Sequence, residues 1–284
     1  LVCDGDIDFD VGNIDFDGSV RVGGTISEGF TVKATGDVTV QTISKAVVEA
    51  GKNLVVEKGI IGSPDTTIKA KGTVTAKFIE NANVAAGANV VVSETIMHSN
   101  VSAAGHVVVR GGKHSSIIGG QTMAGGNVEA KNIGSAQGTK THVDIGIDPA
   151  LREQMTHLQR EIEKIAAAHE KVSVELATLT KLKERSRTMP SGKEARLTEL
   201  KSMAEKLAPV LSTLQTQLAA LQQKSSGAAL GFISVKEKIF PGTHLSILDQ
   251  TLNVNREQSS CRFYFNRDKK EIGSSDFKEV EISY

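Results

Sequence analysis

Short apolar strings recur along the first half of the chain at a nearly constant spacing. Successive strings begin 18, 16, 20, 16, 17 and 21 residues apart. Their first residues form a ladder of positions: Val20, Val38, Leu54, Val74, Val90, Val107 and Val128. A spacing held over so many repeats indicates a repeat architecture.

Two further ladders recur at a similar spacing. The second has the same six gaps in the same order: Ile14, Val32, Val48, Ile68, Val84, Val101 and Thr122. The third consists of isoleucines alone: Ile26, Ile43, Ile60, Ile79, Ile96, Ile117 and Ile133. Three short strands in every 16 to 21 residues are typical of a parallel β-helix, in which each coil buries the inward face of its neighbour. We therefore predict a mainly β fold, with parallel β-helix coils over residues 1–147.

The most regular unit within a coil is an apolar residue, any residue, alanine and then glycine. Val48-Glu49-Ala50-Gly51 is one example. Strand alternation points Val48 and Ala50 inward and Glu49 outward. We expect the glycine to supply a positive-φ corner, where the chain turns to the next side of the coil.

The periodicity changes near Asp148 and Pro149, which are suited to the N-cap and the first position of a helix. Apolar residues then recur in steps of three and four over two stretches, at positions 151, 155, 158, 162, 165, 172, 176 and 179, and at 197, 200, 207, 211, 214, 218 and 221. This pattern predicts an antiparallel α-helical coiled-coil hairpin over residues 148–226, with its turn at Met189–Gly192. His169 and Ala204 are weak points of its seam.

The strand pattern returns over residues 227–284. Ile233-Ser234-Val235 and Leu245-Ser246-Ile247 resemble further coil material, so the hairpin is predicted to be an insertion in one continuous β-helix. The alternating residues 262–265 and 280–282 are expected to pair along an edge or to cover an open end. At the other end, Leu1 already lies close to a strand-like string, so we expect a preceding region to be missing.

The amino-acid composition argues against several classes of function. Lys plus Arg and Asp plus Glu number 33 each, which gives no net field to attract nucleic acid. Aromatic residues make up 4%, which argues against an aromatic-lined ligand pocket. Cys3 and Cys261 match no disulfide or metal spacing and favour a reducing compartment. No apolar stretch is long enough for membrane insertion, so we expect a cytoplasmic protein.

Two groups of residues suggest chemistry. The acidic opening suggests a calcium cluster, but its members alternate with apolar residues, which favours a solvated strand face: Asp4, Asp6, Asp8, Asp10, Asp15 and Asp17. Four histidines fall in one stretch: His98, His106, His114 and His142. His98 and His114 are one coil apart and could stack to bind a metal or move a proton. With no ligand set at a matching offset, surface or corner histidines are favoured, and we assign no catalytic, cofactor or metal residue.

Several strings and the order of the segments resemble the flagellar assembly protein A family of bacteria. The strings are residues 36–40 (GDVTV), 76–82 (AKFIENA), 96–99 (IMHS), 117–120 (IIGG) and 239–242 (IFPG), together with the hairpin and the return to strands. The resemblance implies a right-handed β-helix and a role in flagellar biogenesis, with the cell pole as a candidate location. It implies no active-site motif.

The resulting hypothesis is a non-enzymatic scaffold that acts in flagellar assembly or its regulation through protein contacts of its β-helix faces and coiled-coil arm. We expect regulatory or flagellar-assembly protein partners, and self-association through the arm or the β-helix ends. One alternative is a self-assembling cytoskeletal element. Another is a hexapeptide-type acyltransferase using His98, His106 or His114, although its strict 18-residue coil does not fit these gaps.

Overall fold

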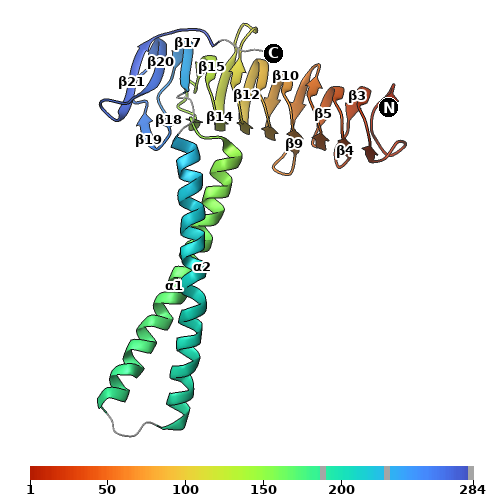
Figure 1. Ribbon diagram of the computed structural model, residues 1–284. Helices are drawn as coiled ribbons and strands as arrows, with labels where there is room; N and C mark the ends of the chain where they lie inside the picture. The colour runs from red at the N-terminus through yellow and green to blue at the C-terminus, as the bar shows by residue number, and fades with distance from the viewer. Residues whose placement is uncertain (186–189, 227–230, 281–284) are drawn as a thin grey trace. The chain divides into compact units, whose positions relative to one another are not determined.

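The structure, a computed structural model, describes residues 1–185, 190–226 and 231–280. The chain divides into two compact units. One is built from Leu1–Pro149 and Ala228–Tyr284, and the other from Ala150–Gly227. Strands form the first unit and two helices form the second (Figure 1).

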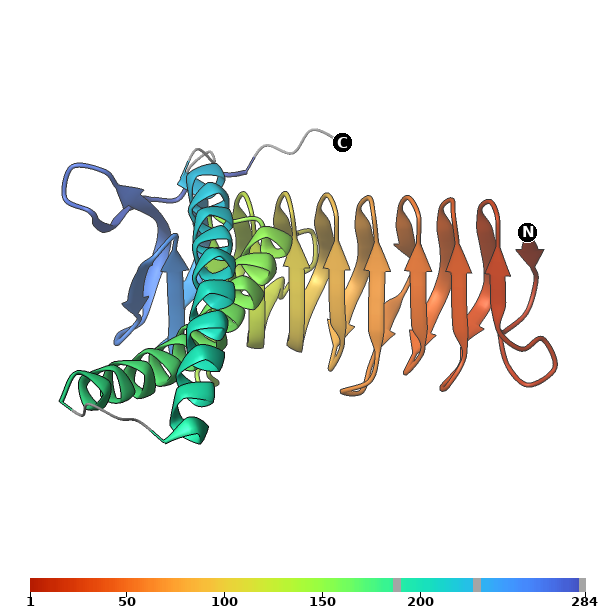
Figure 2. The ribbon, with the colours of Figure 1, turned by 60° about the horizontal axis from the view of Figure 1, so that its bottom comes forward.

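The first unit is a β-solenoid of about 8 turns, as the three ladders predict (Figure 2). Its strands are β1 (Val2–Cys3), β2 (Ile14–Phe16), β3 (Val20–Ile26), β4 (Thr31–Ala34), β5 (Val38–Ser44), β6 (Val47–Ala50), β7 (Leu54–Val56), β8 (Gly59–Ile61), β9 (Thr67–Ala70), β10 (Val74–Glu80), β11 (Asn83–Ala86), β12 (Val90–Ala103), β13 (Val107–Val109), β14 (Ser116–Ala124), β15 (Val128–Ile133), β16 (Thr141–Ile145), β17 (Phe232–Ile239), β18 (Thr243–Ile247), β19 (Gln250–Asn253), β20 (Gln258–Asn266) and β21 (Glu271–Asp276).

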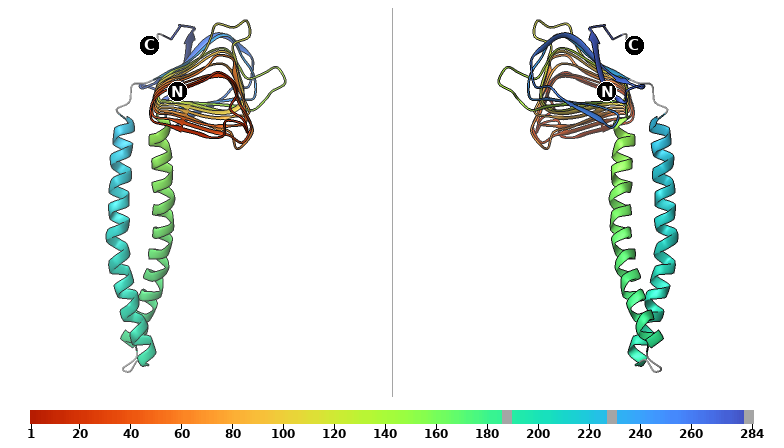
Figure 3. Two further views of the ribbon diagram at one scale, coloured as in Figure 1. Left: turned by 90° about the vertical axis from the view of Figure 1, so that its right-hand side faces the viewer. Right: turned by 90° about the vertical axis from the view of Figure 1, so that its left-hand side faces the viewer.

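Each ladder forms one wall of the solenoid, and the end-on view shows the walls enclosing a common interior (Figure 3). We call them the first, second and third walls, after the ladders that begin at Val20, Ile14 and Ile26. Successive ladder residues pair in parallel register along the first wall, the second and the third. Every ladder residue is buried. The solenoid is therefore held together by apolar burial between coils.

The inserted helices interrupt the sequence but not the stack. β15 pairs in parallel with β17, which places Val128 beside Ile233, and β16 pairs in parallel with β18. The helical unit thus leaves the solenoid at the corner between β16, on the second wall, and β17, on the first. Ile233 and Leu245 continue the first and second ladders and are fully buried.

Antiparallel strands close the end of the stack that follows the insertion. β20 pairs with β17, β21 pairs with β20, and β19 pairs with β18. The Arg262 guanidinium lies 3.3 Å from the centroid of the Phe232 ring, which adds a cation–π contact between β17 and β20. These strands pair the edge that the last parallel strands would otherwise leave open. The expected strand over residues 280–282 lies mostly outside the described residues.

The second unit consists of α1 (Pro149–Arg185) and α2 (Ser191–Ser226), which lie alongside each other (Figure 3). The turn was expected at Met189–Gly192. Ser191 and Gly192 instead begin α2, where the carbonyl of Pro190 accepts the backbone N–H of Lys193 at 2.9 Å. Met189 lies outside the described residues. Coiled-coil packing between the helices stays a prediction.

The expected role of the corner glycines is wrong. Gly51 has no positive φ; a Cβ there would lie 2.1 Å from the carbonyl oxygen of Thr35 on the adjacent coil. Glycine is needed because the coils approach closely, not because the backbone turns left-handed. At the corner between the third and second walls, positive φ values occur both at glycines, such as Gly134 (φ 82), and at non-glycine residues, such as Asn81 (φ 51).

We predict that Gly51→Ala lowers the free energy of unfolding by about 1–3 kcal/mol, because the new methyl group must displace a backbone carbonyl. The control is Gly5→Ala, since nothing lies within 4 Å of a Cβ at Gly5. Urea denaturation of both variants tests this prediction. Equal stability of the two variants would contradict the close-approach explanation.

Candidate functional site

The outward side of the first wall carries one row of register-matched side chains, one per coil: Arg21, Thr39, Val55, Thr75, Val91, Val108, Glu129 and Ser234. The first five are exposed or half-buried, as expected for an outward row. Val108, Glu129 and Ser234 are buried, with exposed fractions of 0%, 4% and 0%. Something therefore covers this end of the row.

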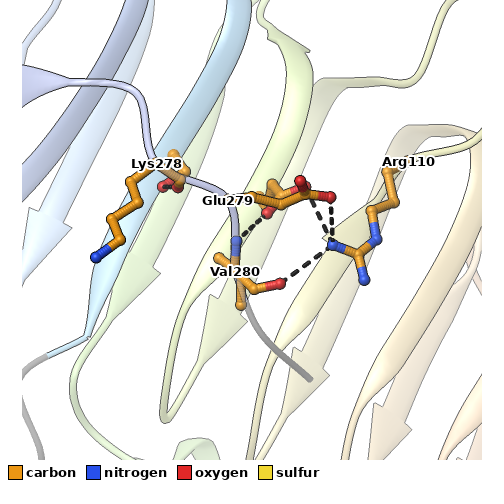
Figure 4. Close-up of polar contacts among 6 residues, drawn as sticks. Arg110, Lys278, Glu279 and Val280 are labelled. Carbon is orange, nitrogen blue, oxygen red and sulfur yellow. Dashed lines mark hydrogen bonds and ion pairs between the residues drawn. The ribbon is translucent and has the colours of Figure 1, made fainter. Parts of the chain in front are cut away.

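The cover is the chain's own Lys278–Val280, which follows β21 (Figure 4). The Ser234 hydroxyl donates to the carbonyl of Lys278 at 2.9 Å. The backbone N–H of Val280 donates to Glu129 Oε2 at 2.5 Å. Val280 is itself 1% exposed. We call Lys278–Val280 the strap, and the surface formed by Val108, Arg110, Glu129 and Ser234 the strap groove.

Arg110 holds the strap by two further contacts. Its Nη1 donates to Glu279 Oε1 at 3.0 Å and to the carbonyl of Val280 at 3.1 Å. The same nitrogen lies 3.6 Å from Glu129 Oε1. Arg110 therefore connects the groove carboxylate to the backbone and the acidic side chain of the strap (Figure 4).

Glu129 is a buried acidic residue whose hydrogen bonds and ion pair only partly offset the cost of burying its charge. Burial raises the pKa of Glu129 above its usual range, and the Glu279 carboxylate adds to this rise. The Val280 N–H and the Arg110 guanidinium oppose the rise. Binding of the strap therefore removes the Glu129 carboxylate from water, which disfavours its charged form. The sequence gives little sign of this site, because Glu129 is a single acidic residue in β15.

The four candidate histidines do not form one cluster. His98 lies at the positive-φ corner between the third and second walls, His106 precedes β13, and His114 precedes β14. The expected stack of His98 on His114 is not formed, because the register pairs Met97 with Ile118.

His142 instead stacks on His244, with ring centroids 4.8 Å apart and planes 13° from parallel. The two residues are register partners on β16 and β18. His244 Nδ1 also lies 2.5 Å from Asn253 Oδ1. Sequence periodicity missed His244, because the helical unit separates the two strands along the chain.

Two of the acidic residues near the N-terminus accept hydrogen bonds from the next coil. Asp6 Oδ1 accepts the backbone N–H of Thr25 at 2.6 Å, and Asp17 Oδ1 accepts the Thr35 hydroxyl at 2.7 Å. Over residues 1–185, 190–226 and 231–280, no three His, Cys, Asp or Glu side chains are grouped to hold a metal ion. Cys3 and Cys261 are free thiols, and burial raises the pKa of Cys261.

His106 belongs to a ladder of side chains along the corner between the second and first walls. Each side chain of this ladder accepts a hydrogen bond from the backbone N–H of the corresponding residue in the next coil. Asn89 Oδ1 accepts the N–H of His106 at 2.8 Å, His106 Nδ1 accepts that of Asn127 at 2.9 Å, and Asn127 Oδ1 accepts that of Phe232 at 3.0 Å. His106 thus acts as an asparagine substitute, and only its neutral ring can accept this bond.

Burial lowers the pKa of His106 from its ordinary value of 6.5. The unfolded chain therefore binds this proton more readily than the folded one, and the stability from neutral His106 is lost as pH falls below 6.5. We predict that His106→Asn weakens the loss of stability between pH 7.5 and 5.5, because asparagine accepts the same bond at both pH values. His106→Ala should cost about 1 kcal/mol at pH 7.5. Urea midpoints measure both effects; an identical pH dependence of wild type and His106→Asn would contradict this role.

A sequence profile described as "Flagellar Assembly Protein A beta solenoid domain" matches residues 1–272. The chain belongs to the flagellar assembly protein A family. The match spans the solenoid and the inserted helices, so the resemblance inferred from the short strings is confirmed. Comparison with curated proteins and with solved structures gives no match.

Membership of the flagellar assembly protein A family implies a role in flagellar assembly. The family is not known as an enzyme family. Within the described parts of α1 and α2, no segment is long and apolar enough to cross a membrane.

Proposed function

We propose that this family member is a non-enzymatic scaffold that promotes flagellar assembly by binding regulatory or flagellar-assembly proteins through its helical arm and its solenoid walls. Its proposed place of action is the cytoplasm, at the cell pole. The observation that carries the proposal is the open apolar seam of the helical unit.

The seam runs along both helices, which cover most of each seam side chain but bury few of them completely. Among its described residues only Ile162 on α1, and Leu197 and Leu200 on α2, are buried. The other seam leucines, isoleucines and valines are partly exposed. Each partly exposed seam residue keeps some apolar surface in contact with water, and this surface is available for contact with a partner.

A cleft marks where the helices stand apart. It encloses about 660 Å³ and lies between the start of α1 and the end of α2. Leu158 and Leu221 line it from opposite helices. Burying one leucine side chain stabilises a contact by about 1.5–3 kcal/mol. A partner helix that fills the cleft would therefore gain affinity from both leucines.

Polar contacts between the helices do not compensate for the open seam. Arg196 Nε and Nη2 each lie 2.9 Å from a different carboxylate oxygen of Glu175, and the bonds from Arg196 lower the pKa of Glu175. Lys183 lies 3.7 Å from Glu194. All four side chains are about half exposed. Such pairs add little stability but fix the antiparallel pairing of the helices.

We predict that Leu158→Ser combined with Leu221→Ser weakens partner binding at least tenfold, because an apolar contact of at least ~1.4 kcal/mol is lost. The control combines Val174→Ser and Met203→Ser, which are exposed apolar residues outside the seam, one on each helix. Pull-down from a flagellated host and rescue of flagella in a strain lacking the gene provide the two readouts. Circular dichroism checks that both variants keep their helices.

The proposal fails if the seam variant, and a chain in which a short linker replaces residues 150–227, both capture the same partners and restore flagella as well as wild type. Sedimentation of the purified chain tests self-association separately. A dimer that the seam variant abolishes would identify a second copy as one occupant of the arm.

A further inference from the structure

We propose that the strap groove is a receptor for an extended segment of a partner protein in which an acidic residue precedes a small apolar one, and that the strap occupies this receptor until the partner displaces it. The inference rests on the proposed function, since it names a class of partner for one solenoid wall. The strap itself shows the chemistry that the groove recognises.

Most contacts of the groove are hydrogen bonds to backbone atoms of the strap. Ser234 donates to the carbonyl of Lys278, Glu129 accepts the N–H of Val280, and Arg110 donates to the carbonyl of Val280. Any extended segment carries these groups in the same order. The groove can therefore form the same backbone hydrogen bonds with an extended segment of another chain.

Two side chains of the strap supply selectivity. The Glu279 carboxylate pairs with Arg110 at 3.0 Å, and the Val280 side chain is buried at the groove, where Val108 is also fully buried. An acidic residue followed by valine or a residue of similar size satisfies both features. Lysine at the first position would face Arg110, and a charged residue at the second would have to leave water unpaired.

The ion pair of the strap is open to water, which makes displacement of the strap easier. Glu279 is 65% exposed and Arg110 is 31% exposed, so water competes for their ion pair. The strap contacts lie beyond β21, so the strap can leave while the β20–β21 pairing remains.

The outward row continues past the strap groove with side chains that are half-buried or exposed among the described residues. Val91 is the register neighbour of Val108, and the row proceeds through Thr75 to Val55, which is 38% exposed. A partner segment longer than the strap can extend along these small and β-branched side chains. Contacts with these residues would add to the affinity of a longer partner segment and would favour displacement of the strap.

The test uses the full chain and a fluorescein-labelled peptide with the sequence of residues 276–282 (DFKEVEI). We expect a chain with Glu279→Gln and Val280→Ser to bind the peptide at least tenfold more tightly than wild type in fluorescence anisotropy, because its own strap competes less. Adding Arg110→Gln should remove the gain, whereas adding Arg21→Gln, an exposed arginine of the same row, should preserve it. A peptide with lysine and aspartate at the Glu279 and Val280 positions should not bind.

A second measurement needs no variant. Excess peptide should speed hydrogen exchange at the Val280 amide of the wild-type chain, because displacement frees the bond to Glu129. The inference is overturned if exchange is unchanged, if the strap-weakened chain binds no better than wild type, or if Arg110→Gln has no effect.

Two further outcomes separate related ideas. A wild-type dimer that the peptide dissolves would show that the occupant is a second copy, and would overturn the proposal of a partner segment. The seam variants of the arm should bind the peptide normally. Loss of peptide binding with intact arm-dependent partner capture would therefore reject this inference and leave the proposed function standing.

Discussion

The structure depends on one constraint: every coil must place its apolar residues directly over those of the previous coil. A single coil cannot bury its own inward residues, so its stability comes from its neighbours. The isoleucine ladder that begins at Ile26 shows the result, since all its members are fully buried. Close stacking also dictates glycine at Gly51 and hydrogen-bonding side chains at the corners, as at Asn89 and His106.

The need to stack each coil on the previous one divides the residues into those that hold the stack together and those that are available for function. Inward residues and corner acceptors contribute to the stack itself, so the residues available for contact with other molecules lie on the outward rows, at the ends and on the inserted arm. At the strap groove, an outward row binds an extended segment through Arg110, Glu129 and Ser234. In the arm, apolar side chains such as Leu158 line an open cleft. Both features fit a protein that works by contact.

Sequence periodicity predicted the walls, because burial repeats with the coil and leaves a visible pattern. It also placed the helices, whose seam recurs in steps of three and four. It placed Ser191 and Gly192 in the turn of the arm rather than at the start of α2, because proline followed by serine and glycine suits a helix start as well as a turn. It missed the strap groove and the His142–His244 stack, because both join segments separated by the insertion and no local spacing records such a pairing.

Register across the insertion is the central claim, and cysteine cross-linking tests it most directly. In a chain with Cys3 and Cys261 replaced by serine, His142→Cys and His244→Cys should be joined rapidly by a short bis-maleimide, since these residues are register partners. The mismatched pair His114→Cys and His244→Cys should not be joined. Equal cross-linking of both pairs, or none of either, would contradict a stack that continues in register past the inserted helices.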